Sequence, residues 1–280
     1  MAQAVLITGC STGIGRAAAE RLAGGERTVY ATARRLDSIA DLEAKGCRLL
    51  ELDVTDEGSM RAAVERVERD EGAVGALVNN AGYSQSGAVE EVPLDQVRRQ
   101  FETNVFGLLR MCQLVLPGMR AKGEGRIVNI SSMGGRLTFP GGGIYHATKH
   151  AVEALSDALR FEVGGFGIQV VVIEPGLIKT GFAETAVGSI HEATPEHGPY
   201  ADFNRAVGAA TAGAYESGLA RLGGGPETVA KKIERAISAR RPRTRYLVTP
   251  SAPLILSARR VLPDRLWDRM VGSTYPQPRP

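Results

Sequence analysis

The sequence predicts an α/β fold in which a doubly wound parallel sheet carries helices on both of its faces. Short apolar, β-branched runs alternate along the chain with longer stretches of helical apolar spacing. A glycine-rich turn directly follows the first apolar run, and Tyr145 and Lys149 open a later helical stretch. The 280 residues are enough for one large α/β domain or two small ones.

The composition is that of an ordinary globular protein, with 43% hydrophobic and 23% charged residues. A formal net charge of +3 is too small to indicate nucleic acid as a partner. Three scattered cysteines lack metal-ligand spacing and fit a reducing interior better than secretion. We find no signal-peptide pattern and no apolar run long enough for a membrane span, so we expect a cytoplasmic protein without a metal site.

The first expected strand, residues 4–8, leads into the glycine-rich turn and then into a helical pattern from Ala17. Glycines allow the backbone to approach a pyrophosphate closely, and a helix N-terminus offers free N–H groups and a positive dipole end. The context therefore predicts a dinucleotide site. The alternative is a simple glycine turn.

The second expected strand, residues 28–32, leads into Arg34 and Arg35. Folds that bind NAD usually place an acid here, about 20 residues after the glycine loop, to bind the ribose 2′-hydroxyl. Arginine instead binds a 2′-phosphate bidentately, so we predict NADP(H) rather than NAD(H), with Arg34 as the main contact and Arg35 as the second choice. The alternative is a solvated basic turn.

Further strands are expected at residues 48–52, 75–79, 125–130, 169–173 and 245–248, and helices at 57–69, 94–116 and 226–239. Thr55 or Asp56 is placed to cap the helix at 57–69.

Tyr145 and Lys149 stand four residues apart, so they share one face of the expected helix. A fixed positive charge beside a tyrosine stabilises its phenolate and lowers its pKa from the reference value of about 10. Such a tyrosine can act as a general acid and base near neutral pH. Alone, this spacing is weak evidence, because it occurs by chance in many helices.

The loop pattern Thr-Gly-x-x-x-Gly-x-Gly, together with Tyr145 and Lys149, resembles the classical short-chain dehydrogenase/reductase family. The resemblance extends through Asn79-Asn80-Ala81-Gly82 and Pro175-Gly176 to about Thr180. It implies a single Rossmann-type domain over residues 1–250, with a helical substrate lid at about 181–225. It also implies homodimers or homotetramers and an oxidoreductase that transfers hydride between a nicotinamide and a carbonyl carbon.

The resemblance implies catalytic roles for Asn104, Ser132, Tyr145 and Lys149. Tyr145 would exchange a proton with the substrate oxygen, and Lys149 would assist it and bind the nicotinamide ribose. Asn104 would kink its helix and hold a water of the proton relay. Ser132 would donate a hydrogen bond to the substrate oxygen, whereas Ser131 is interpreted as a structural hydroxyl bonded to nearby backbone.

The implied cofactor contacts are Thr8, Gly9, Ser11, Thr12, Gly13, Ile14, Gly15, Arg34, Arg35, Asp53, Val54, Asn80, Ala81, Gly82, Tyr145, Lys149, Pro175, Gly176, Ile178 and Thr180. The implied substrate contacts are Ser132, Met133, Tyr145 and Phe182, with Val187 and Ile190 as further candidates in the lid.

The loop, the second strand and the long tail resemble the branch of 17β-hydroxysteroid and retinol dehydrogenases, which implies a lipophilic ketone, aldehyde or alcohol as substrate. Two other functions stay open. One is a reductase of carrier-bound ketoacyl substrates, and the other is a non-catalytic NADP-binding regulator.

Residues 251–280 form a basic extension with apolar residues, among them Leu262 and Trp267, and with Arg259, Arg260, Arg265 and Arg269 against Asp264 and Asp268. We expect this extension to pack on the domain, over the substrate mouth, or on another subunit. The alternative is that it lies on a membrane surface.

Overall fold

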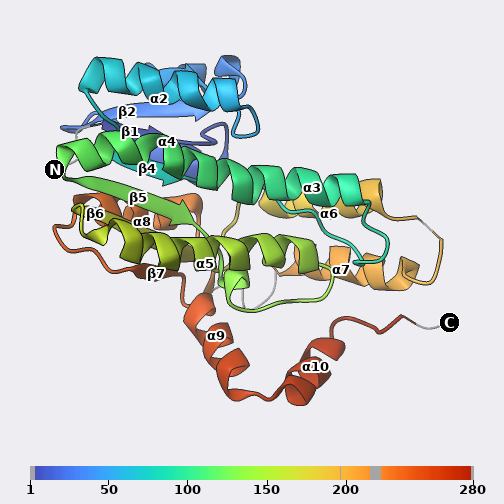
Figure 1. Cartoon of the computed structure of the whole chain (residues 1–280). Helices are drawn as coiled ribbons and strands as arrows, with labels where there is room; N and C mark the ends of the chain where they lie inside the picture. Colours follow the sequence, from blue (N-terminus) through green and yellow to red (C-terminus); the bar gives the residue numbers. More distant parts are fainter. Residues whose placement is uncertain (1–3, 196, 215–221, 279–280) are drawn as a thin grey trace.

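A computed structural model describes residues 4–195, 197–214 and 222–278. Within the described residues, seven strands run parallel in one sheet, in the order β3-β2-β1-β4-β5-β6-β7, with helices on both faces (Figure 1). The strands are β1 (Ala4–Ile7), β2 (Thr28–Ala33), β3 (Cys47–Glu51), β4 (Ala76–Asn79), β5 (Gly125–Ile130), β6 (Ile168–Pro175) and β7 (Arg245–Val248). The predicted doubly wound α/β fold is confirmed.

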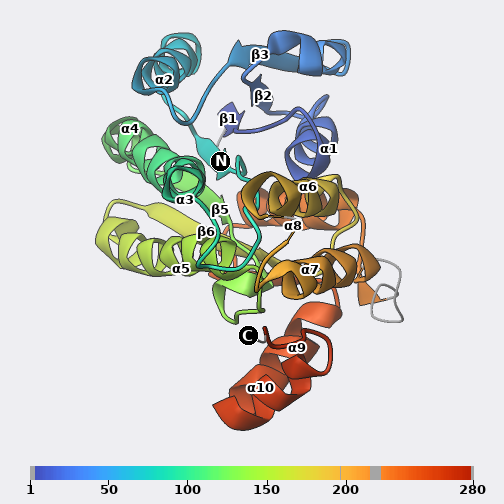
Figure 2. The same ribbon diagram turned by 90° about the vertical axis from the view of Figure 1, so that its right-hand side faces the viewer.

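The sheet separates two apolar cores, because successive side chains of a strand point to opposite faces. In β1, Val5 and Ile7 belong to one core, which is covered by α1 (Gly13–Leu22) and α8 (Pro226–Ser238). Ala4 and Leu6 belong to the other core. That core is covered by α2 (Glu57–Glu71), α4 (Gly107–Lys122) and α5 (Gly143–Gly164), which lie together on one side in Figure 2.

The expected helix over residues 94–116 is in fact three segments that run on from one another. They are α3 (Leu94–Phe101), a π-helical turn, η2 (Glu102–Phe106), and α4. The prediction was wrong at the end as well, since α4 continues through Pro117 to Lys122. Val115 and Met119 on either side of the proline are fully buried, so packing outweighs the poor helix propensity of proline here.

The other described helical segments are η1 (Leu36–Leu42), η3 (Met133–Gly135), α6 (Phe182–Ala193), α7 (Ala201–Gly213), α9 (Ser251–Val261) and α10 (Asp264–Gly272). The helices α6 and α7 fall in the stretch expected to be the substrate lid, of which residues 196 and 215–221 lie outside the described residues. The pair α9–α10 follows β7 and extends away from the sheet (Figure 1). In the described part of the chain, no helix combines the length and the apolar character needed to cross a membrane.

Candidate active site

The carboxyl ends of the strands border a cavity of about 1780 Å³. In a doubly wound sheet, ligands bind at this edge, where the strand order reverses between β1 and β4. The cavity wall includes residues that follow β1 to β6 in turn, namely Gly9, Arg34, Asp53, Asn80, Ser131 and Gly176. Its other walls include residues of α3, η2, η3, α5, α6, α7, α9 and α10.

The glycine-rich loop forms one end of the cavity through Gly9, Ser11, Thr12, Gly13 and Ile14. Gly9 and Gly13 have φ angles of 72° and 61°, a region that favours glycine. Within the described residues, no side chain caps the N-terminus of α1 and no acid lies in its first turn. The free N–H groups and the positive dipole end of α1 therefore fit a phosphate group.

Thr8 and Gly15, both expected to contact the cofactor, do not line the cavity. The Thr8 hydroxyl is buried and accepts hydrogen bonds from the backbone N–H groups of Asn80 and Ala81, each at 3.0 Å. A Cβ atom on Gly15 would lie 2.3 Å from the Gly9 carbonyl oxygen and 2.4 Å from Asn80 Nδ2. The two residues therefore shape the loop and hold it against the end of β4.

Arg34 lines the cavity, whereas Arg35 does not. Both side chains are exposed, and neither forms an ion pair with any residue that the structure describes. Arg34 is therefore placed to meet an anionic group that enters the cavity beyond β2.

Asp53, Val54 and Thr55 line the cavity beyond β3. One carboxylate oxygen of Asp53, Oδ1, accepts hydrogen bonds from Thr55, from its backbone N–H at 2.9 Å and from its hydroxyl at 2.8 Å. Asp56, rather than Thr55, caps α2 by accepting the Ser59 N–H at 2.8 Å. The sequence allowed either Thr55 or Asp56 as the cap of this helix, and the structure shows Asp56.

Tyr145 and Lys149 both line the cavity from α5, and the Lys149 Nζ atom lies 5.8 Å from the centre of the Tyr145 ring. Lys149 is buried and donates a hydrogen bond to the Ile130 carbonyl oxygen at 2.8 Å. Burial lowers the pKa of Lys149 to about 8, an effect that the Glu153 carboxylate opposes. The helix thus presents a phenol and a buried ammonium on one face.

Ser131 and Ser132 both line the cavity. The sequence led us to expect that the Ser131 hydroxyl bonds to nearby backbone, and this prediction was wrong. Ser132 Oγ, not Ser131 Oγ, bonds to local backbone, since it accepts the Gly134 N–H at 3.0 Å and caps η3. The buried Ser131 Oγ has no hydrogen-bond partner among the described residues. Because Ser132 Oγ is an acceptor in this contact, its own O–H remains able to donate.

Asn104 lies in the π-helical turn and is buried, but it does not line the cavity. Its side-chain N–H groups donate to the Tyr83 carbonyl at 2.9 Å and to Thr148 Oγ1 at 3.1 Å, and its Oδ1 accepts the Tyr83 N–H at 3.1 Å. The Thr148 hydroxyl in turn donates to the Tyr145 carbonyl at 2.7 Å. Asn104 therefore links the loop after β4 to the first turn of α5.

The remaining predicted cofactor contacts, Asn80, Ala81, Gly82, Pro175, Gly176, Ile178 and Thr180, all line the cavity. Met133 and Phe182 line it too, and the rings of Phe182 and Tyr145 lie 5.3 Å apart. Val187 and Ile190 do not line it.

A row of rings that the sequence interpretation missed leads from Tyr145 to the C-terminal extension. Successive ring centres lie 5.6 Å apart between Tyr145 and His146, 6.2 Å between His146 and Phe139, and 5.8 Å between Phe139 and Trp267. Burial lowers the pKa of His146 to about 4, so the ring is neutral at pH 7. The available signal was the single tryptophan of the chain, which lies in the extension.

A group of charged side chains around the buried Glu174 links α5 to the sheet. Arg245 Nε lies 3.1 Å from Glu153 Oε2 and 3.2 Å from Glu174 Oε1. Arg245 Nη2 also lies 2.6 Å from Asp157 Oδ2, and Arg136 lies 3.5 Å from Glu174. Burial raises the pKa of Glu174, as does the neighbouring Glu153 carboxylate, whereas Arg136 and Arg245 act in the opposite direction.

Comparison with known proteins is consistent with this geometry. A family model described as short chain dehydrogenase matches residues 3–189. A 3-ketodihydrosphingosine reductase from Bacteroides thetaiotaomicron is 41% identical over 201 residues, which cover 71% of this chain and 72% of that protein. An NADPH-dependent 3-dehydrocapnine reductase from Ornithobacterium rhinotracheale is 34% identical over 277 residues, which cover 95% of this chain and 94% of that protein. Among solved structures, a short-chain dehydrogenase from Streptomyces avermitilis matches with a TM-score of 0.81 and 35% identity, over 96% of this chain and 94% of that one.

Proposed function

This chain belongs to the short chain dehydrogenase family, and on that premise we propose that it reduces the carbonyl group of a lipophilic ketone or aldehyde with NADPH. The family relationship makes the protein an NAD(P)-dependent oxidoreductase that acts on CH–OH groups. The choice of NADPH and of a lipophilic substrate goes beyond the family and is argued from this chain's own residues.

The apolar half of the cavity is the observation that carries the substrate proposal. From Tyr145, the row of rings leads to a wall formed by α7, α9 and α10, which contains Val207, Leu254, Ile255, Trp267 and Val271. The cavity, at about 1780 Å³, exceeds the roughly 300–1,000 Å³ typical of a small-molecule pocket, so it has room for a dinucleotide and a second molecule. A mostly apolar substrate would remove this wall from water.

The names of two relatives support the same class of substrate. The relatives are reductases of 3-ketodihydrosphingosine and of 3-dehydrocapnine. Steroids and retinoids, which the resemblance of the sequence suggested, are narrower members of the lipophilic class.

The cofactor proposal rests on the glycine-rich loop and on Arg34. The loop and the N-terminus of α1 would hold the pyrophosphate, and Arg34 would bind the 2′-phosphate that distinguishes NADPH from NADH. The relative from Ornithobacterium rhinotracheale is described as NADPH-dependent. Asp53 and the residues from Pro175 to Thr180 would line the adenosine and nicotinamide ends, as the family pattern implies.

A bound nicotinamide dinucleotide supplies the hydride that reduces the carbonyl carbon. Tyr145 gives its phenolic proton to the carbonyl oxygen as that oxygen becomes an alcohol, and it takes the proton back in the reverse reaction. The Lys149 ammonium, 5.8 Å from the ring centre, stabilises the phenolate that remains.

Ser132 polarises the substrate oxygen. Its Oγ accepts a hydrogen bond from the Gly134 N–H, which fixes the position of this oxygen. The Ser132 hydroxyl proton is then free to point into the cavity, where we assign the substrate oxygen as its acceptor. Asn104 positions the site, because it connects the loop after β4 through Thr148 to the backbone of Tyr145.

The test is NADPH oxidation with a series of alkyl ketones of increasing chain length, extended to steroids and retinal. Each methylene buried is worth about 0.8 kcal/mol, so kcat/KM should rise up to roughly fourfold per carbon until the cavity is filled. A flat series, or turnover only with ketones bound to a carrier protein, would contradict the proposal.

A variant at the far end of the row of rings makes the test specific. Trp267→Ala should lower kcat/KM for the longest ketones by about tenfold or more and leave the shortest ketone unchanged, since only a long substrate reaches α10. Phe161→Ala is the matched control, because Phe161 is 89% exposed and does not line the cavity.

A further inference from the structure

The C-terminal extension carries an unusual number of exposed large apolar side chains. Leu254, Val261, Leu266 and Met270 are 56%, 79%, 46% and 46% exposed, and they all belong to α9 and α10. In α10, the buried pair Trp267 and Val271 faces inward. One position before each of them, Leu266 and Met270 form a second apolar pair, of which about half is exposed to solvent.

Exposed arginines accompany these side chains. Arg265 and Arg269 are one turn apart on α10, beside Leu266 and Met270, and Arg260 directly precedes Val261 at the end of α9. Between residues 251 and 278 four arginines stand against two aspartates, a net charge of +2.

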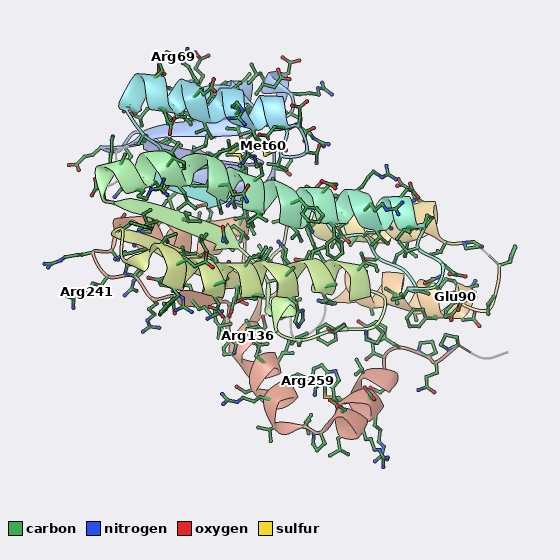
Figure 3. The ribbon with its side chains drawn as sticks, in the orientation of Figure 1. Met60, Arg69, Glu90, Arg136, Arg241 and Arg259 are labelled. Carbon is green, nitrogen blue, oxygen red and sulfur yellow. The ribbon has the colours of Figure 1, made fainter. Side chains whose placement is uncertain are left out.

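Arg259, which is labelled in Figure 3, has a different role. It pairs with Asp264 at 2.6 Å and lies 5.5 Å from the Trp267 ring centre. It therefore fastens α9 to α10. The other arginines of these two helices, Arg260, Arg265 and Arg269, are exposed.

Two of the four exposed apolar residues of α9 and α10 also border the cavity. Leu254 and Met270 line the cavity although about half of each side chain is exposed, whereas Trp267 and Val271 line it from buried positions. The extension also projects from the body of the molecule (Figures 1 and 2). A ligand that passes over α9 and α10 would thus move from one apolar surface to another.

We propose that the outer face of α9–α10, formed by Leu254, Val261, Leu266 and Met270 with Arg260, Arg265 and Arg269, docks on an anionic lipid surface and exchanges lipophilic substrate with it. Apolar side chains insert between the lipid headgroups, and the arginines bind the phosphates bidentately. The exchange of substrate rests on the proposed function, but docking on lipid can be measured without any substrate.

The charge of the surface favours lipid over a second copy of this chain. A symmetric contact through this face would bring the same arginines of two copies close together, which costs free energy unless acids intervene. An anionic bilayer instead compensates the arginines, and each is worth roughly fivefold in binding near such a surface.

The experiment is flotation of the full-length protein with vesicles of phosphatidylcholine alone or with phosphatidylglycerol added. We expect binding that depends on phosphatidylglycerol and falls as salt is raised. Val261→Asp combined with Leu266→Asp should reduce vesicle binding at least tenfold and leave NADPH turnover of a soluble ketone unchanged, because neither residue lines the cavity. Phe161→Asp, on α5, is the matched control and should bind vesicles as the parent does.

Equal flotation of the double variant and the parent, or no flotation with either vesicle, would overturn the proposal. Sedimentation velocity adds a separate test, since a dimer that the double variant converts to monomer would identify a second copy as the occupant and overturn lipid docking. If the parent protein bound the anionic vesicles but turned over none of the lipophilic ketones, the proposed function would be refuted and the docking would stand.

Discussion

The Nζ atom of Lys149 donates a hydrogen bond over 2.8 Å to the carbonyl oxygen of Ile130, so α5 is fastened to the last residue of β5. Ser131 and Ser132 follow directly, and Tyr145 lies one turn before Lys149 on the helix. One contact between a side chain and the backbone thus sets the relative positions of the three groups assigned to the reaction.

The burial of Lys149 has a consequence for stability. The folded chain releases the Lys149 proton near pH 8, whereas an unfolded chain keeps it to about pH 10.5. Between these values the unfolded state binds more protons, so the contribution of Lys149 to the free energy of unfolding should rise with pH, by up to roughly 3 kcal/mol. Denaturant unfolding at several pH values should show this rise in the parent relative to Lys149→Met. Lys179→Met, at an exposed lysine, should follow the parent, and equal pH dependence in all three proteins would contradict the burial of the charge.

Arg34 should decide the choice of cofactor. Arg34→Asp removes a charged hydrogen-bond donor and adds repulsion, so NADPH affinity should fall by roughly 10- to 100-fold or more and NADH affinity should not fall. Arg35→Asp makes the same change in charge outside the cavity wall and should alter the preference much less. Fluorescence titration with both nucleotides measures the effect. An unchanged NADPH-to-NADH preference in Arg34→Asp would remove the basis for the NADPH assignment.

The two serines should differ in their effect on the chemical step. Ser132→Ala removes the hydroxyl assigned to the substrate oxygen and should lower kcat by about 10²- to 10³-fold with NADPH affinity retained. Ser132→Thr keeps the hydroxyl and should restore part of the rate. Ser131→Ala should have little effect on kcat. If Ser131→Ala were the more damaging change, the roles of the two hydroxyls would be reversed.

The sheet was predictable because buried parallel strands are short, apolar and bounded by turn residues. The strand bounds 125–130 and 245–248 agree with β5 and β7 residue for residue. Apolar spacing at 94–116 indicated a helix, but it could not show the π-helical turn at Glu102–Phe106, since a single wider turn shifts the pattern by only one residue.

The side-chain orientations at the site could not be predicted from residue type alone. Both serines after β5 can bond to backbone, and only the local path of the chain places the Ser132 oxygen at the Gly134 N–H. Arg34 and Arg35 are of one residue type as well; Arg34 was predicted as the main contact and Arg35 as the second choice, and of the two only Arg34 borders the cavity. The row of rings joins residues 139, 145, 146 and 267, and no local pattern could reveal a contact over that separation.

The central claim is that Tyr145 exchanges the proton with the substrate oxygen, and Tyr145→Phe tests it most directly. This variant removes the ionisable hydroxyl and keeps the ring that packs against Phe182 and His146. Steady-state turnover with NADPH and the best ketone should fall by several orders of magnitude, while NADPH still binds with the affinity of the parent protein. Turnover within about tenfold of the parent would contradict the assignment.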